Sequence, residues 1–245
     1  MKVIILAGGL GTRISEETND KPKPMILINN KPILWHVMNI YSIQGFNNFI
    51  ISTGYKSNVI ENWVQNNKIL NSNSQEMKIS LVNTGINTQT GGRISEIMRS
   101  YPGETVMATY GDGLGNIPIN QTLKFHDSHQ KLATLTAVRP PARFGHLEIN
   151  GSKVVKFGEK NQADSGWING GFFILKPQVV NFIESTDEPF ESGALTRLTK
   201  NSELIAYKHR GFWQPMDTLR EKQILEQLAL SPNPPWLNEL EASPF

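Results

Sequence analysis

The sequence predicts an α/β protein built on a mostly parallel sheet, and three observations support this prediction. Short apolar runs such as residues 2–6 alternate with segments whose apolar residues recur at helical spacing. The chain has 245 residues, of which 38% are hydrophobic and 9% aromatic, which suits one large domain with a sizeable core. The first apolar run ends at glycines, as a strand that leads into a ligand loop does. We therefore expect right-handed βαβ units in a three-layer, Rossmann-like sandwich, with a smaller antiparallel part.

The first half of the chain is expected to alternate strands with helices. The run at 2–6 is uniformly apolar, as in a strand buried on both faces. After the glycine-rich loop, helical periodicity begins at Ile33 and stops at Gly45. In chain order we predict a strand at 2–6, a helix at 33–43, a strand at 48–53, a helix from 59, a strand at 77–82, a short helix at 92–98 and a strand at 105–109.

The second half reads differently. A strand is expected at 133–138, and Asn150-Gly151-Ser152 predicts a hairpin turn between strands at 147–149 and 153–157. One further strand is expected at 167–175, with helices after Pro177, at 193–200 and at 217–230. We divide a single domain into a first half (1–131), a second half (132–230) and a tail (231–245).

Composition excludes several classes of protein. The chain has no cysteine, which rules out thiol catalysis, cysteine-ligated metals and disulfides, and which suits a cytoplasmic protein. A net charge of +2 gives no electrostatic case for nucleic acid or an anionic membrane as a partner. The apolar run at the N-terminus is too short for a signal peptide or a membrane span.

The loop after the first strand has the composition of a phosphate-binding loop. Glycines let backbone N–H groups approach an anion, and the arginine that follows them offers a planar fork to phosphoryl oxygens. The loop lacks the endings of a dinucleotide fingerprint and of a P-loop, so it belongs to neither familiar class. Its residues are Leu6, Ala7, Gly8, Gly9, Leu10, Gly11, Thr12 and Arg13, and Lys21-Pro22-Lys23-Pro24 follows closely.

This combination resembles the sugar-1-phosphate nucleotidylyltransferases, and within them the glucose-1-phosphate cytidylyltransferases. Further segments fit the same subgroup in order along nearly the whole chain: Lys31–His36, Thr90–Arg93, Thr109–Gly113, Ala142–Gly145, Ile168–Phe173 and Gly211–Arg220.

The resemblance implies transfer of a cytidylyl group from CTP to α-D-glucose 1-phosphate, giving CDP-glucose and pyrophosphate for surface polysaccharide or deoxysugar synthesis. Arg13 and Lys23 are the implied catalytic cations on the phosphates, where positioning and charge neutralisation dominate. Lys21 is more simply a solvated loop lysine. No general base is needed, because the attacking phosphate is already anionic.

The implied cofactor is Mg²⁺, which prefers one or two carboxylates together with phosphate oxygens. Asp112 follows the strand at 105–109, and the resemblance makes Asp217 the second ligand. From its position alone, Asp217 is more simply an N-cap of the last helix, and the two roles can coexist.

Base and sugar contacts are also implied by the resemblance. The nucleotide set comprises the first loop with Lys23, Thr88, Arg93 and Gly111. Arg93 lies near a helix start, where the dipole disfavours cations, and a bound anion would explain it. The sugar-phosphate set comprises Tyr110, Glu159, Lys160, Asn169 and Gly170, with Trp213 and Gln214 as candidate walls. Glu159 and Lys160 would also suit an ordinary polar turn.

The five histidines suggest no catalytic pair and no metal site. His126 and His129 are read as a solvated helix face.

We expect a homo-oligomer, although residues 66–76 are shorter than the insertion found there in the subgroup. Three alternatives stay open: transfer of a uridylyl or thymidylyl group to a hexose 1-phosphate, a nucleotide-sugar-binding homologue without turnover, and a dinucleotide-dependent oxidoreductase.

Overall fold

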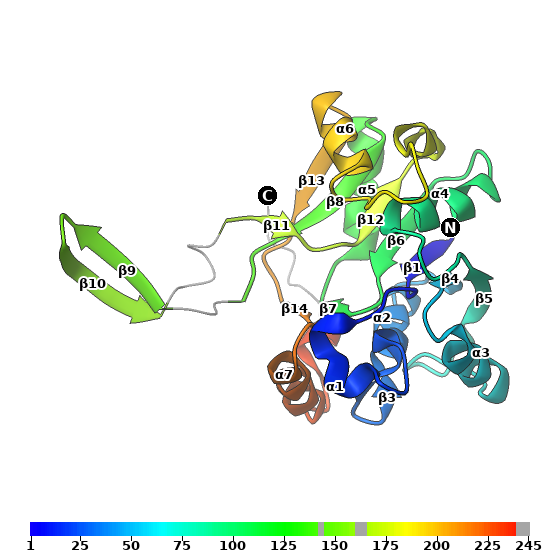
Figure 1. The fold of residues 1–245 in the computed structure, drawn as a ribbon, viewed down its shortest axis with the longest axis horizontal. Helices are drawn as coiled ribbons and strands as arrows, with labels where there is room; N and C mark the ends of the chain where they lie inside the picture. The colour runs from blue at the N-terminus through cyan, green and yellow to red at the C-terminus, as the bar shows by residue number, and fades with distance from the viewer. Residues whose placement is uncertain (142–144, 160–165, 239–245) are drawn as a thin grey trace.

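A computed structural model of the protein describes residues 1–141, 145–159 and 166–238. Its centre is a sheet with the strand order β11-β8-β12-β6-β1-β4-β5, and β13 also pairs with β8 (Figure 1). The pairs β1–β4, β1–β6, β4–β5 and β8–β13 are parallel, whereas β12 and β11 run antiparallel to their neighbours. The predicted mixed, mostly parallel sheet is therefore confirmed.

The strands of this sheet are β1 (Val3–Leu6), β4 (Asn48–Thr53), β5 (Lys78–Asn83), β6 (Val106–Tyr110), β8 (Ala133–Val138), β11 (Ile168–Asn169), β12 (Phe173–Leu175) and β13 (Leu204–Lys208). Smaller antiparallel pairs are β2 (Leu27–Ile28) with β3 (Lys31–Pro32), β7 (Gly113–Gly115) with β14 (Trp213–Pro215), and β9 (Gly145–Asn150) with β10 (Lys153–Glu159).

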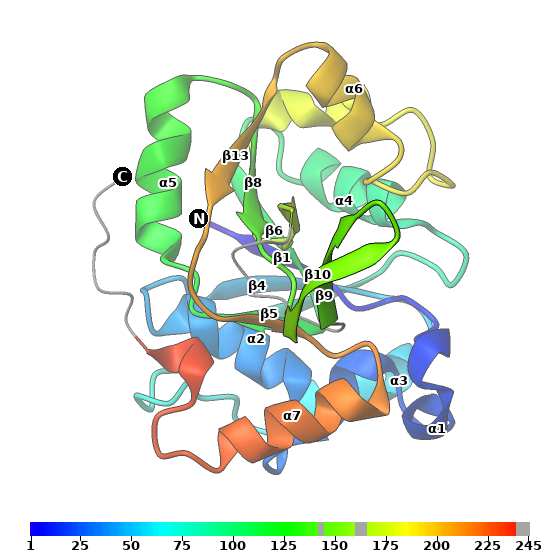
Figure 2. The same ribbon diagram turned by 90° about the vertical axis from the view of Figure 1, so that its left-hand side faces the viewer.

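Helices cover both faces of the sheet (Figure 2). On one side lie α2 (Ile33–Ser42), α3 (Ser57–Asn66) and α7 (Leu219–Ala229), and on the other α4 (Thr90–Arg99) and α6 (Ala194–Lys200). The remaining helices are α1 (Ser15–Thr18), α5 (Ile119–His129) and the short 3-10 turns η1 (Thr12–Ile14), η2 (Lys23–Met25), η4 (Pro177–Phe182) and η5 (Pro235–Leu237).

Alternate residues of β1 supply the two cores that this layering requires. Val3 and Ile5 belong to the cluster beneath α2, whereas Ile4 and Leu6 belong to the cluster beneath α4. Successive side chains of a strand point to opposite faces, so a strand that is apolar at every position is buried on both.

The hairpin β9–β10 projects away from the rest of the molecule (Figure 1). Its turn contains Gly151 at a φ of 62°, a left-handed conformation that glycine adopts without strain. The predicted hairpin is therefore confirmed. Within the described ranges, no helix is long and apolar enough to cross a membrane.

One predicted element is wrong. The strand expected at 167–175 is broken into β11 and β12, because Gly171 and Phe172 take left-handed φ values of 78° and 50°. The helix predicted after Pro177 does form, as the 3-10 helix η4.

Candidate active site

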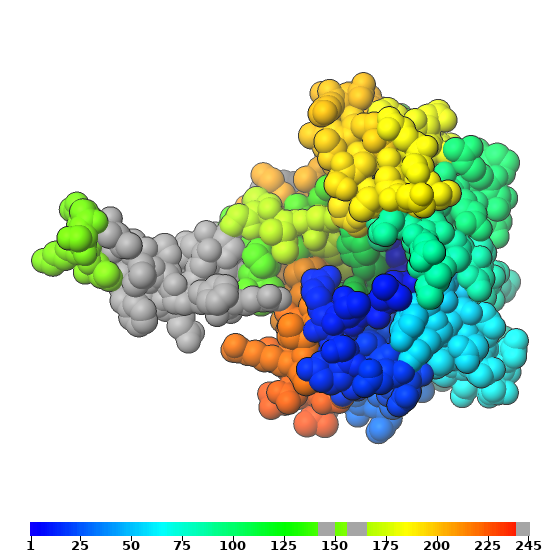
Figure 3. All heavy atoms as spheres, viewed as in Figure 1, coloured from blue at the N-terminus to red at the C-terminus, as the bar shows by residue number. Residues whose placement is uncertain are grey.

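A cavity of about 900 Å³ opens at the carboxyl edge of the sheet, and the surface is hollowed there beside the N-terminal segment (blue in Figure 3). Ligands of open α/β sheets bind at this edge. Every residue of the predicted nucleotide set lines the cavity, and so do Asp112, Asp217, Tyr110, Asn169 and Gly170. The structure thus gathers residues that extend from Leu6 to Asp217 along the sequence.

The three glycines of the first loop have different structural roles. Gly11 has a φ of 65°, which is the left-handed region. A Cβ on Gly8 would lie 2.0 Å from Nη1 of Arg93, so the side of Gly8 is occupied by a guanidinium. A Cβ on Gly9 would meet nothing within 4 Å. Only Gly11 therefore needs the positive φ that glycine permits.

Arg93 is buried, with 3% of its surface exposed, and it ties the loop to the sheet. Nη1 donates to the carbonyl of Thr53 (2.8 Å) and to Oγ1 of Thr84 (2.6 Å), and Nη2 donates to the carbonyl of Gly8 (3.0 Å). Burial lowers the pKa of this guanidinium from its ordinary value. These protein acceptors account for an arginine near a helix start without a bound anion. Arg93 nevertheless lines the cavity, so its contact with a nucleotide remains a proposal.

Four charged side chains meet at the mouth of the cavity. Nζ of Lys23 donates to Oδ2 of Asp112 (2.7 Å) and to Oδ1 of Asp217 (2.6 Å). Nη1 of Arg13 donates to the other oxygen of Asp217 (2.7 Å). The side chain of Lys23 is 8% exposed, whereas that of Arg13 is 74% exposed. Lys23 is therefore fixed beneath two carboxylates, while Arg13 can reach into solvent or towards a ligand.

Burial alone would lower the pKa of Lys23, but the carboxylates of Asp112 and Asp217 outweigh burial, and the pKa is raised. The lysine therefore remains an ammonium at neutral pH. A charge-assisted pair of this kind is shorter and stronger than a neutral hydrogen bond.

Asp112 and Asp217 meet because two short strands pair. Gly113 of β7 lies opposite Pro215 of β14, and the N–H of Met216 donates to the carbonyl of Asp112 (2.9 Å). The residues that flank this antiparallel pair are consequently neighbours. The sequence analysis identified neither strand, since both are only three residues long.

Asp217 is not the cap of α7. The N-cap is Thr218, whose hydroxyl accepts from the N–H of Glu221 while the Glu221 carboxylate accepts from the N–H of Thr218. The same carboxylate accepts from the N–H of Asp217 (2.7 Å). The side chain of Asp217 is thereby free of capping and bonds to Lys23 and Arg13.

The predicted sugar residues divide into two groups. Tyr110, Asn169 and Gly170 lie on one wall of the cavity together with Trp213. Gln214 does not line it and is buried. Glu159 ends the projecting strand β10, where only the backbone is described, and Lys160 lies outside the described residues.

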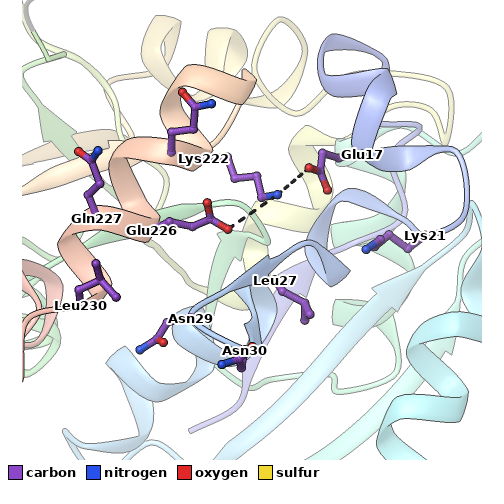
Figure 4. A pocket seen from close by; sticks show the side chains of 10 residues that line it. Glu17, Lys21, Leu27, Asn29, Asn30, Lys222, Glu226, Gln227 and Leu230 are labelled. Atoms are coloured by element: carbon purple, nitrogen blue, oxygen red, sulfur yellow. Dashed lines mark hydrogen bonds and ion pairs between the residues drawn. The ribbon is translucent and has the colours of Figure 1, made fainter.

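Lys21 lines a different hollow from Lys23. This second cavity, of about 560 Å³, lies between the β2–β3 turn and α7 (Figure 4). Within it, Lys222 bonds to Glu17 (2.6 Å) and lies 3.8 Å from Glu226. The position of Lys21 away from the charged cluster agrees with a loop lysine.

The prediction of a solvated histidine face is wrong for His126. This residue is fully buried, and its Nδ1 lies 2.8 Å from Oγ1 of Thr134 on β8. His129 reaches the same hydroxyl through Nε2 (2.8 Å). The spacing of the two histidines indicated a helix but not which face of that helix packs against the sheet.

Sequence reasoning also missed Glu191, a half-buried carboxylate in the wall of the main cavity. It lies just before α6 in a segment without a recognisable motif. Only its proximity to Tyr110 in the folded chain identifies it.

Known proteins resemble this chain over most of its length. The family model for nucleotidyl transferases matches residues 2–218. The glucose-1-phosphate cytidylyltransferase of Salmonella typhimurium is 44% identical, over 96% of this chain and 98% of its own. The D-glycero-alpha-D-manno-heptose 1-phosphate guanylyltransferase of Aneurinibacillus thermoaerophilus is 34% identical, over 78% and 80%.

Among solved structures, a UDP-glucose pyrophosphorylase complexed with UDP-glucose superposes with a TM-score of 0.71. The match covers 94% of this chain and 98% of that one, at 18% identity. The two chains therefore share a fold.

Proposed function

The chain belongs to the nucleotidyl transferase family, and from that premise we propose that it transfers a cytidylyl group from CTP to α-D-glucose 1-phosphate. The products are CDP-glucose and pyrophosphate. The 44% identity to a glucose-1-phosphate cytidylyltransferase over nearly the full length of both chains supports the choice of base and sugar. The observation that carries the reaction class is the cluster of Lys23, Arg13, Asp112 and Asp217 at the mouth of the cavity.

In the proposed reaction, a phosphate oxygen of glucose 1-phosphate attacks the α-phosphorus of CTP. A bond forms between that oxygen and the α-phosphorus, the bond to the bridging oxygen of the β-phosphate breaks, and its electron pair leaves on pyrophosphate. The two substrates carry like charges, so the protein must hold them in line and neutralise them. The ammonium of Lys23 and the exposed guanidinium of Arg13 are the groups present to do so.

The two carboxylates fit a divalent cation of the Mg²⁺ type. Among the described residues no group of three or more His, Cys, Asp or Glu could hold a metal, so any ion there would complete its shell with phosphate oxygens and water. Asp112 and Asp217 would hold it, and the ion would neutralise charge on the triphosphate. Both carboxylates already bond to one cation, the ammonium group of Lys23.

The remaining assignments are also proposals. The first loop, Lys23, Thr88, Arg93 and Gly111 would contact the nucleotide, and Arg93 would also position that loop. The proposed sugar contacts are Tyr110, Glu159, Lys160, Asn169 and Gly170. Nucleotide contacts in residues 1–131 and sugar contacts in 132–230 within one domain, and a homo-oligomeric state, belong to the same proposal.

The test is pyrophosphate release from glucose 1-phosphate with each of CTP, UTP, dTTP, GTP and ATP. We expect release with CTP that is abolished by EDTA and restored by MgCl₂. Release with no nucleotide under Mg²⁺ would contradict enzymatic activity, and a preference for UTP or dTTP would replace the cytidylyl assignment. Arg13→Ala and Lys23→Ala should each lower turnover by roughly 10²- to 10³-fold, the scale for one preorganised electrostatic group.

A further inference from the structure

Glu191 forms the centre of a polar chain along one wall of the main cavity. Its Oε1 accepts from the hydroxyl of Tyr110 (2.6 Å), and its Oε2 accepts from the hydroxyl of Thr90 (2.8 Å). Thr90 in turn accepts from the N–H of Phe190 (2.8 Å), so the carboxylate is held from both sides. Nδ2 of Asn169 donates to the Tyr110 hydroxyl (3.1 Å).

Each hydrogen bond in this polar chain has a fixed donor and a fixed acceptor. Asn169 is oriented because its Oδ1 accepts from the N–H of Gly171 (2.9 Å). The Tyr110 hydroxyl then accepts a hydrogen bond from Asn169 and donates one to Glu191. A tyrosine hydroxyl that already accepts one hydrogen bond has its own hydrogen left for the carboxylate beside it. Glu191 is consequently held as an acceptor.

A carboxylate has about four acceptor positions, more than the two bonds from Tyr110 and Thr90 use. Glu191, its partners Thr90 and Tyr110, and Asn169 beyond Tyr110 all line the cavity. Phosphate groups carry no proton to donate at neutral pH and would be repelled. A ligand group that faces Glu191 is therefore a hydrogen-bond donor, such as a hydroxyl or an amino group.

We propose that Glu191 determines sugar specificity by accepting hydrogen bonds from ring hydroxyls of the hexose 1-phosphate. The proposal rests on the proposed function and extends it to a residue outside the predicted set. The hexose is favoured over the base because the neighbours of Glu191 are proposed sugar contacts. Glu191 bonds to Tyr110, and Tyr110 bonds to Asn169. Asn169 and Gly170, which also belong to that set, line the same cavity. The amino group of cytosine is the competing donor, and the experiment separates the two.

The primary test is Glu191→Gln, which preserves shape and removes the charge. We expect the KM for glucose 1-phosphate to rise by about 10- to 100-fold, as for loss of a hydrogen bond to a charged group. The KM for CTP should stay within about threefold, a margin far below one such bond. Glu203→Gln is the matched control, because Glu203 is another partly buried carboxylate, bonded to Lys131 and to the N–H of Leu132, and does not line the cavity.

A panel of 2-, 3-, 4- and 6-deoxyglucose 1-phosphates gives the second readout. In the unaltered protein, at least one deoxy sugar should lose about 10- to 100-fold in kcat/KM, because a buried acceptor is left unpaired. In Glu191→Gln that penalty should shrink at least fivefold. A purely structural role for Glu191 would leave the pattern of penalties unchanged.

The proposal is overturned if Glu191→Gln raises only the KM for CTP, or if both proteins show identical deoxy-sugar penalties. If Glu191→Gln does not fold, Tyr110→Phe removes one anchor of the carboxylate and should weaken the same deoxy penalty. Failure of the proposed function is distinct, since it would be seen as an inactive unaltered protein. Activity with another nucleotide or hexose phosphate would leave the Glu191 test applicable to those substrates.

Discussion

Gly8→Ala should destabilise the protein because its new methyl group collides with Arg93. The added Cβ would lie 2.0 Å from Nη1, 2.4 Å from Cζ and 2.8 Å from Nη2. A guanidinium at the end of a flexible side chain would ordinarily swing aside. This one is 3% exposed and is fixed by hydrogen bonds to Gly8, Thr53 and Thr84, so moving it leaves buried acceptors unpaired.

The expected cost combines two effects. Overpacking a closed site costs about 1–3 kcal/mol, and leaving a buried hydrogen-bonding group unpaired costs about 1–3 kcal/mol more. We expect the free energy of unfolding to fall by about 2–6 kcal/mol. For a chain of this length that corresponds to a Tm roughly 10 °C lower. Urea unfolding followed by circular dichroism measures the change.

Gly9→Ala is the matched control. A Cβ at Gly9 would meet nothing within 4 Å, and its φ is not in the left-handed region. Its stability should change by less than about 1 kcal/mol, with the reduced freedom of the unfolded chain favouring alanine.

A double-mutant cycle tests the cause. In an Arg93→Ala background, the cost of Gly8→Ala should drop by at least about 2 kcal/mol, because the colliding group is gone. The reasoning is refuted if Gly8→Ala costs no more than Gly9→Ala, or if its cost persists undiminished without Arg93.

Three further predictions concern charge. Lys23→Met should lower the free energy of unfolding by about 3 kcal/mol, because it leaves two partly exposed carboxylates without their shared cation. Added MgCl₂ should then raise the Tm of this variant more than that of the unaltered protein, and equal responses would contradict a cation site. Glu221→Ala should lower the free energy of unfolding by about 1–2 kcal/mol, because the capping box of α7 is lost. Turnover should fall by roughly tenfold, because the Glu221 carboxylate also holds the N–H of Asp217. Unchanged turnover would contradict this positioning role. Burial lowers the pKa of His36 and of His126 to about 4, so the unfolded chain takes up these protons first. Stability should therefore fall as pH drops from about 6.5 towards 4, by about 2 kcal/mol for each ring at pH 5, and a flat series of urea midpoints between pH 7 and 5 would refute this.

Local patterns in the sequence predicted much of the sheet correctly. The strand at 48–53 coincides with β4, and 2–6 differs from β1 by one residue. A strand that is apolar at every position is buried on both faces, so its pattern predicts a layer of helices on each side of the sheet. The strand predicted at 167–175 failed, because the left-handed residues at its centre include Phe172, which no sequence rule marks for that conformation.

What the sequence by itself determined is the class of fold, the loop at the end of the first strand and the identity of the charged residues beside it. Those features depend on residues that are close together in the sequence. Only the tertiary structure decided that Lys23 is shared between Asp112 and Asp217, that Arg93 closes beneath Gly8, and that Glu191 faces the cavity. These contacts join distant segments through short pairings such as β7 with β14, and three residues are too few to leave a periodic signal.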